Sequence, residues 1–207
     1  MRYQICVSGA ASGESVGVAH ELAFALGAEI AKAGKTLLTG ATVGLPHYAA
    51  MGFVSVKNAK GSSIGFSPAS SYREHVSTYR LPTKEFDYIN FTSMEYVGRD
   101  VHLVRSADAV ITVGGRMGSL HELATALESR KVCGVLTGSG GLADYVPTLK
   151  HVEAPGGKDV IFDTDPARLV AKVVEALDAR YADFHDVDNE RDVLMEEPAT
   201  PVKKRRG

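Results

Sequence analysis

Residues 109–119 read AVITVGGRMGS, and this stretch decides the fold. Its five leading residues are apolar or β-branched and predict a strand buried on both faces, as in a parallel sheet. Gly114 and Gly115 follow at once, and a helical pattern begins at about 119 and runs to 129. A buried strand that passes through a glycine turn directly into a helix is the βα junction from which α/β sheets are built.

The same alternation of strand and helix extends over the rest of the chain. Further strands are predicted at 3–8, 36–39, 62–66, 88–91, 132–136 and 160–162. Further helices are predicted at about 16–33, from Pro46 to Gly61, at about 94–106 and from Asp165-Pro166 to about 181, with 67–87 irregular. Strands and helices at this spacing imply a parallel sheet covered on both faces. We therefore predict a three-layer, Rossmann-like, doubly wound α/β fold.

The composition is that of an ordinary globular protein. Of the 207 residues 44% are apolar, too many for a disordered chain, and 23% are charged. The 23 basic and 25 acidic residues give a net charge of −2, which argues against a nucleic-acid-binding protein of the usual basic kind. No apolar run approaches the roughly 18 residues of a membrane span. Because Cys6 and Cys133 sit in apolar runs, we expect buried reduced thiols in a cytoplasmic protein.

The charge divides the chain into two parts. Residues 183–207 contain seven acids and five bases, which account for the whole net charge of −2, whereas 1–182 contain 18 of each. We predict a single domain over 1–182 and a mobile charged tail over 183–207. The basic run 203–206 could contact nucleic acid or an acidic partner, but four exposed bases are more often simply solvated.

Three of the predicted strands end in loops of small residues that lead into helices. These loops read SGAASG over 8–13, GATVG over 40–44 and GGRMGS over 114–119. All three fall at the carboxyl edge of the sheet, where open α/β sheets bind ligands and helix N-termini offer N–H groups to a phosphate. The sequence has neither a P-loop Gly-Lys-Ser/Thr nor a clean G-x-G-x-x-G followed by an acid. The alternative is that the glycines only make tight turns.

These loops supply the candidate residues for binding a phosphate or nucleotide. They are Ser8, Gly9, Gly40, Gly44, Gly114, Gly115, Arg116, Met117, Gly118 and Ser119. Glu122 follows at a spacing from Ser119 that also fits a capping box, which would make the glutamate purely structural. Arg99 lies early in the helix before strand 109–113. It therefore points into the same crevice as Glu122, unless it is an ordinary surface arginine.

The run 106–123, SADAVITVGGRMGSLHEL, resembles the signature of the LOG (LONELY GUY) family. That signature is P-G-G-x-G-T-x-x-E after a strand that begins near Ser-Asp-Ala. Segments 8–10 and 40–45 are similar to the family's first and second loops, and the resemblance covers most of 3–177. Many members were once called lysine decarboxylases, and related Rossmann-like branches include molybdenum-cofactor carrier proteins and nucleotide-sensing domains.

Several positions depart from the family pattern. Val113 replaces the motif's proline, and Ser119 replaces a threonine while keeping the hydroxyl. Arg116-Met117 makes the glycine loop one residue longer than in the strict signature. Segment 45–47 reads Leu-Pro-His where Leu-Met-Gly is common, and Asp100 stands where the plant-type enzymes carry lysine. These changes surround the predicted ligand and leave the predicted sheet intact.

The resemblance implies a nucleoside 5′-monophosphate phosphoribohydrolase of the cytokinin-activating type, which releases a free base and ribose 5-phosphate. Arg99, nine residues before Asp108, and Glu122 fall on the catalytic arginine and the motif glutamate. The carboxylate would stabilise an oxocarbenium-like ribose and activate water, while loop 114–119 would hold the 5′-phosphate. The alternative is a non-catalytic nucleotide or molybdenum-cofactor binding or carrier protein of the same fold.

The resemblance further implies a homodimer that uses no cofactor. The seven histidines form no H-x-x-x-H or Cys/His cluster, so we expect no metal site. No residue is marked as a buried Schiff-base lysine, which disfavours a pyridoxal-phosphate decarboxylase.

Overall fold

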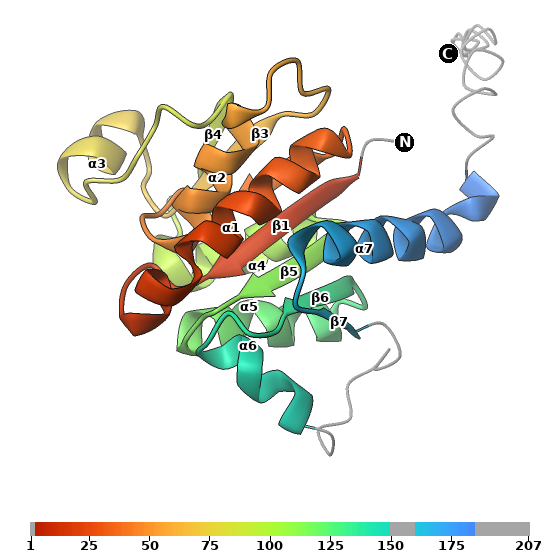
Figure 1. The fold of residues 1–207 in the computed structure, drawn as a ribbon. Coiled ribbons are helices and arrows are strands. Elements are labelled where there is room, and N and C mark those ends of the chain that lie inside the picture. The colour runs from red at the N-terminus through yellow and green to blue at the C-terminus, as the bar shows by residue number, and fades with distance from the viewer. Residues whose placement is uncertain (1–2, 150–159, 185–207) are drawn as a thin grey trace, which may run out of the picture.

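A computed structural model describes residues 3–149 and 160–184 and contains a seven-stranded, all-parallel sheet (Figure 1). The strands are β1 (Gln4–Gly9), β2 (Thr36–Thr39), β3 (Ser63–Ser67), β4 (Tyr88–Phe91), β5 (Ala109–Val113), β6 (Val132–Leu136) and β7 (Val160–Asp163). Each strand pairs in parallel with its neighbours. The predicted parallel α/β sheet is thereby confirmed. The predicted tail falls, from residue 185 onward, outside the described residues.

Helices cover both faces of this sheet. On one face α1 (Glu14–Lys32) contacts α2 (Leu45–Ser55) and α7 (Pro166–Arg180). On the other face α4 (Glu95–Ser106) contacts α5 (Met117–Glu128). Figure 1 shows α1 and α7 on the near side of the strands and α4 and α5 on the far side. This arrangement is the three-layer Rossmann-like fold that the alternation of strands and helices predicts.

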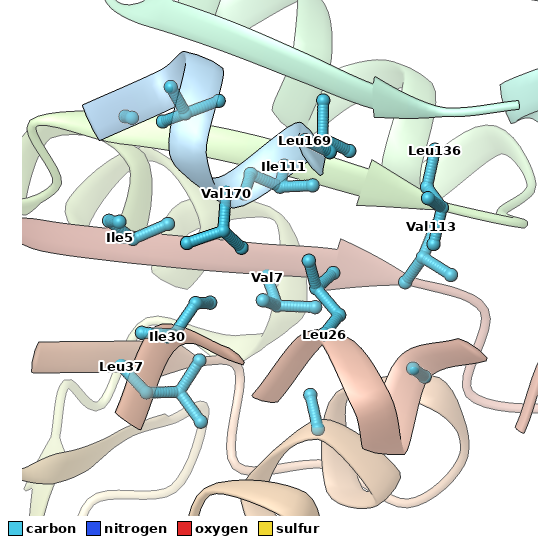
Figure 2. Packing of buried hydrophobic residues seen from close by; sticks show 14 of the residues in the cluster. Ile5, Val7, Leu26, Ile30, Leu37, Ile111, Val113, Leu136, Leu169 and Val170 are labelled. Carbon is cyan, nitrogen blue, oxygen red and sulfur yellow. The ribbon is translucent and has the colours of Figure 1, made fainter. Parts of the chain in front are cut away.

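Consecutive residues of the central strands belong to two separate cores. Ile5 and Val7 of β1 lie in the core beneath α1, with Leu26 and Ile30 of that helix (Figure 2). Cys6, between them in sequence, lies in the second core with residues of α4 and α5. Side chains alternate between the two faces of a strand, so a strand covered on both faces must be apolar throughout.

The order of the strands reverses direction beside β1. The order is β4-β3-β2-β1-β5-β6-β7, so the chain first builds outward from β1 to one edge and then returns. β5 pairs with β1, with Gly9 opposite Val113, and β6 and β7 extend to the other edge. The carboxyl ends of β1 and β5 therefore form the switch point at which sheets of this kind bind ligands.

Three helices differ from the prediction by two residues or more, and one of them, α1, begins at Glu14 and not at about 16. Helix α2 ends at Ser55, because Val56 already has an extended backbone, and does not continue to Gly61. A Cβ on Gly61 would lie 1.8 Å from the carbonyl oxygen of Lys35, so this glycine permits a close approach of two backbones. Helix α5 begins at Met117, two residues before its predicted start.

Short helical segments are the other elements that the sequence pattern does not predict. They are α3 (Tyr72–Ser77), α6 (Leu142–Tyr145) and the 3₁₀ turns Val146–Thr148 and Ala182–Phe184. Each is too short to show a helical period of apolar residues. The ends of the long helices are as expected: Gly34 follows α1 with φ 68°, and Asp165 caps α7 by accepting a hydrogen bond from the N–H of Arg168.

Cys6 and Cys133 are buried and form no disulfide within the described residues, as expected. Among the described residues, no helix combines the length and the apolar character that crossing a bilayer requires.

Candidate functional site

A pocket of about 220 Å³ lies at the switch point, at the carboxyl ends of β1, β2 and β5. The loops after β1 and β2 and the N-terminal parts of α4 and α5 form its walls. It brings together seven of the residues predicted from the sequence: Gly9, Gly40, Arg99, Arg116, Gly118, Ser119 and Glu122. The predicted crevice is therefore a cavity, and Arg99 and Glu122 do share it.

The other candidate residues lie outside the wall of this pocket. Ser8 lies close to it and contacts Glu122, whereas Gly44, Gly114, Gly115 and Met117 do not line it. The pocket is also lined by residues that were not among the individual candidates, namely Ala10, Ala11, Thr42, Pro46, Tyr96 and Asp100, and of these only Tyr96 lies outside the segments that the sequence analysis singled out. Tyr96 and Asp100 lie on the same helix as Arg99, close to it in sequence. This closeness was the one signal in the sequence that could have identified them.

Glu122 is a buried carboxyl group that α5 carries into the pocket. The hydroxyl of Ser8, at the end of β1, donates a hydrogen bond to its Oε2. Burial, and next the negative charge of Asp100, raise the pKa of Glu122 to about 7. Glu122 therefore exchanges a proton near neutral pH, which is the range in which a general acid or base works.

The capping-box interpretation of Ser119 and Glu122 is wrong. Helix α5 begins at Met117 with Arg116 as its N-cap residue, and no side chain caps its N-terminus. Ser119 therefore lies inside the first turn. Because Glu122 lies a further three residues along the helix, its carboxylate faces Ser8 of β1 and not the start of its own helix.

Arg99 is a buried residue, with 5% of its surface exposed, and not an ordinary surface arginine. Its Nη1 donates to the carbonyl oxygens of Gly40 and Phe66, and the distance to the second is 2.9 Å. Its Nε donates to Oδ1 of Asp100 over 3.0 Å. The guanidinium group thus ties α4 to the ends of β2 and β3, and only Nη2 lacks a hydrogen bond within the described residues.

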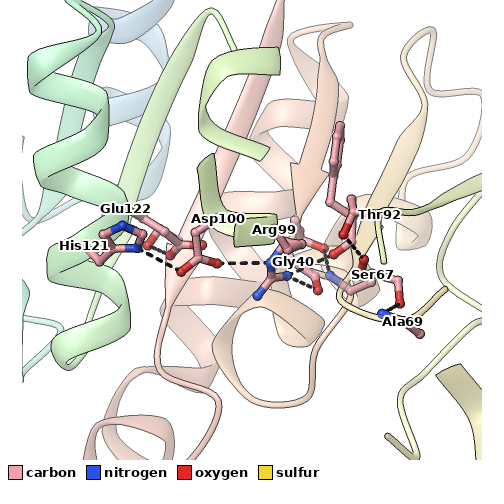
Figure 3. Close-up of polar contacts among 12 residues, drawn as sticks. Gly40, Ser67, Ala69, Thr92, Arg99, Asp100, His121 and Glu122 are labelled. Carbon is pink, nitrogen blue, oxygen red and sulfur yellow. Dashed lines mark hydrogen bonds and ion pairs between the residues drawn. The ribbon is translucent and has the colours of Figure 1, made fainter. Parts of the chain in front are cut away.

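Asp100 links the charges of the site. It is buried, forms an ion pair with Arg99 and contacts Nδ1 of His121, which lies 3.2 Å from its Oδ2 (Figure 3). Its carboxylate neutralises the one buried arginine of the pocket wall. The positive potential that remains for a ligand lies on the opposite side, at the start of α5.

The start of α5 has the features of an anion site. The amide N–H groups of Gly118 and Ser119 and the hydroxyl of Ser119 make no hydrogen bond within the described residues. The exposed guanidinium of Arg116 lies beside them and donates to Oγ of Ser12 over 2.8 Å, so it bridges the loops after β1 and β5. Free N–H groups, the positive end of the helix dipole and an arginine together favour a phosphate group.

A fourth glycine-rich loop, residues 138–141, explains why the glycine pair of the motif does not reach the pocket. Ser139 accepts a hydrogen bond from the N–H of Gly114 over 2.8 Å. The carbonyl oxygens of Gly114 and Gly115 accept from the N–H groups of Ala143 and Leu142. The backbone of both glycines is therefore used to hold the start of α5 in place. Gly114 (φ 55°) and Gly115 (φ 104°) also adopt conformations that favour glycine.

Within residues 3–149 and 160–184, no three His, Cys, Asp or Glu side chains gather in an arrangement that could hold a metal ion. The polar groups of the pocket instead come from α5, which contributes Gly118, Ser119 and Glu122, and from α4, which contributes the pair Arg99 and Asp100. This arrangement suits a small molecule that carries a phosphate.

The fold and the pocket define a Rossmann-like α/β protein with a pocket at the switch point of its sheet. The sequence matches the family model described as the SLOG cluster4 family over residues 2–170, and the chain belongs to that family. The predicted relationship is thus confirmed at the level of SLOG and LOG-like Rossmann-like proteins. A comparison with curated proteins finds no match.

Solved structures with the same fold include carrier proteins. The protein TM1055 has a TM-score of 0.69 and 20% identity, covering 85% of this chain and 99% of its own. A molybdenum cofactor binding protein from the phototrophic bacterium Rippkaea orientalis has a TM-score of 0.65 and 24% identity, covering 86% and 98%. The molybdenum cofactor carrier protein of Chlamydomonas reinhardtii has a TM-score of 0.64 and 25% identity, covering 84% and 98%. The architecture extends over nearly the whole of each relative.

Proposed function

We propose that this protein binds a nucleotide-type small molecule through its phosphate group and acts as a binding or carrier protein. The observation that carries the proposal is the start of α5, where Gly118 and Ser119 present unpaired N–H groups to the pocket beside Arg116. A phosphate there would receive hydrogen bonds from the backbone, from the Ser119 hydroxyl and from a guanidinium group.

The position of Arg99 favours binding over catalysis. The resemblance to the LOG family assigns this residue a catalytic role, yet most of its donors are bound to Gly40, Phe66 and Asp100. Its charge is paired with Asp100, so it adds little attraction for a substrate phosphate. The molybdenum cofactor proteins that share the fold support a carrier, and the molybdenum cofactor belongs among the cargoes to be tested.

A second candidate is the nucleoside 5′-monophosphate phosphoribohydrolase, and Glu122 favours it. Its buried carboxyl group lies in the same pocket as the proposed phosphate site, with a pKa of about 7. In this reaction water adds to the anomeric carbon, the N-glycosidic bond breaks, and the base leaves with a proton. The Glu122 carboxylate would stabilise the positive charge on the ribose and take a proton from water.

One set of measurements separates the two functions. Calorimetric titration with AMP, GMP, CMP and UMP measures binding, and chromatography of the same mixtures measures free base. A carrier binds at least one nucleotide about ten-fold more tightly than the matching nucleoside and releases no base. Equal affinity for nucleotide and nucleoside would overturn the proposed phosphate site.

Variants of the site sharpen this test. Ser119→Ala and Arg116→Ala should each weaken nucleotide binding several-fold, because each removes a donor to the phosphate. Arg73→Ala, on the exposed side of α3, is the matched control and should change nothing. Release of base that Glu122→Gln abolishes would establish the hydrolase instead.

A further inference from the structure

Tyr96 is an exposed aromatic side chain at the pocket. It lies in the first turn of α4 and lines the cavity, yet 46% of its surface is exposed. Arg99, Asp100 and Glu122, which line the same cavity, are buried. Tyr96 therefore stands at the rim of the pocket, whereas these three buried side chains form its floor.

The ring of Tyr96 is held in place before any ligand arrives. The ring of Tyr79 meets it edge-on, with centroids 5.7 Å apart and an interplanar angle of 79°. The guanidinium carbon of Arg99 lies 5.9 Å from the centroid of the Tyr96 ring. An exposed aromatic ring that is already oriented loses little freedom when a flat group stacks on it.

The cavity is too small to enclose a ligand of nucleotide size, so part of such a ligand must extend out of it. The cavity holds about 220 Å³, and pockets that enclose a drug-sized ligand hold roughly 300–1,000 Å³. A phosphate at Gly118 and Ser119 with its sugar or linker would fill much of this volume. The remainder of the molecule would then lie at the rim, where Tyr96 is the aromatic side chain that lines the cavity.

We infer that Tyr96 is the stacking platform for a planar aromatic ring system of the ligand, and that it restricts the cargo to phosphorylated molecules with such a ring. This inference rests on the proposed binding of a phosphorylated ligand. Stacking depends on contact with the flat face of a ring and not on the groups at its edge. Tyr96 therefore favours a ligand with a large ring, such as a bicyclic heterocycle, over a sugar phosphate or acyl phosphate.

The test compares ligands with and without the ring. AMP, GMP and ribose 5-phosphate are titrated into the full chain and into three variants, Tyr96→Leu, Tyr96→Phe and Tyr88→Leu. Tyr88 is an exposed tyrosine on β4 outside the pocket wall and serves as the matched control. Thermal denaturation of each variant establishes that it is folded.

Tyr96→Leu should weaken the purine nucleotides about ten-fold or more and leave ribose 5-phosphate within two-fold of the parent chain. Tyr96→Phe should retain nucleotide affinity, because the ring and not the hydroxyl does the stacking, and Tyr88→Leu should bind as the parent does. Unchanged AMP and GMP affinity in Tyr96→Leu, or an equal loss for ribose 5-phosphate, would overturn the inference while the phosphate site stands. If the parent chain binds none of the three ligands, the inference fails, whereas the proposed function fails only if CMP, UMP and the molybdenum cofactor are not bound either.

Discussion

Arg99 and Asp100 are consecutive residues of α4 that form a buried ion pair, with Nε 3.0 Å from Oδ1. This contact determines how the rest of the pocket is charged. Asp100 pairs with the guanidinium, and its negative charge also acts on Glu122, where it helps burial to raise the pKa of that carboxyl group against the opposite effect of Arg99. One carboxylate thus controls both the arginine and the glutamate that the LOG resemblance places in the site.

Replacing Asp100 with asparagine should lower the pKa of Glu122 from about 7 toward the range of an ordinary glutamate. The change removes a negative charge that disfavours ionisation and leaves the positive charge of Arg99 unpaired beside the carboxyl group. Breaking a buried pair from one side should also cost on the order of 3 kcal/mol of unfolding free energy. Carboxyl NMR titration of Glu122 measures the first effect and urea denaturation the second.

Glu128→Gln is the matched control for this change, because Glu128 lies exposed at the end of α5. It should leave both quantities within error of the parent chain. An unchanged midpoint for Glu122 in the Asp100 variant would mean that burial alone sets its pKa.

Glu122 makes the stability of the protein depend on pH. Its folded pKa of about 7 exceeds the ordinary value of 4.5, so between these values the folded chain holds a proton that the unfolded chain has lost. The contribution is complete below pH 4.5, declines as the pH rises, and is lost above about 7. The expected difference is on the order of 3 kcal/mol.

Glu122→Gln removes this dependence, because the amide has no proton to lose and can still accept from Ser8. The unfolding free energies of both chains, measured by urea denaturation at pH 5 and pH 8, give the result. Between pH 5 and pH 8 the unfolding free energy of the parent chain should fall by more than that of the variant. A difference between the chains that stays constant with pH would contradict the raised pKa.

The sheet could be predicted almost completely from the sequence because each strand has a recognisable pattern of residues. Runs such as 109–113 consist of apolar or β-branched residues, are followed by glycine, and lead into a helical pattern, so the order of elements is unambiguous. The carboxyl-edge site followed from the same rule. The side-chain network inside it did not, because the pairing of Arg99 with Asp100 depends on where the backbones of Gly40 and Phe66 lie.

The spacing Ser-x-x-Glu shows the limit of local patterns. At Ser71 and Glu74 it is a true cap, because Ser71 has an extended backbone and its Oγ accepts from the N–H of Glu74. At Ser119 and Glu122 the same spacing has another meaning, because the helix has already begun at Met117. Only the position of the helix start separates the two, and helix starts are uncertain by one or two residues in any pattern.

Gly40 should not tolerate a side chain. A Cβ at this position would lie 2.0 Å from Nη1 of Arg99, so Gly40→Ala has to displace the guanidinium group from the carbonyl oxygens that it bridges. We expect a loss of about 1–3 kcal/mol in unfolding free energy, measured by chemical denaturation. Gly17→Ala is the control, because no atom lies within 4 Å of its Cβ and α1 gains a better helix former.

The mechanism of this loss can be checked with a second variant. Arg99→Lys removes the guanidinium group that lies against Gly40. The effects of Gly40→Ala and Arg99→Lys on the unfolding free energy should therefore be strongly non-additive when the two changes are combined. Additive effects would show that the alanine acts elsewhere.

Ser139 should matter to the pocket although it does not line it. Its Oγ accepts from the N–H of Gly114 and its hydroxyl donates to the carbonyl oxygen of Leu136, all within a buried turn. Ser139→Ala leaves a buried N–H without a partner, which should cost about 1–3 kcal/mol in unfolding free energy. Because Gly114 leads directly into α5, the change should also weaken nucleotide binding at Gly118. Ser129→Ala, at the exposed end of α5, should do neither. If Ser139→Ala lowers stability but leaves nucleotide affinity intact, the fourth loop supports the fold without positioning the start of α5.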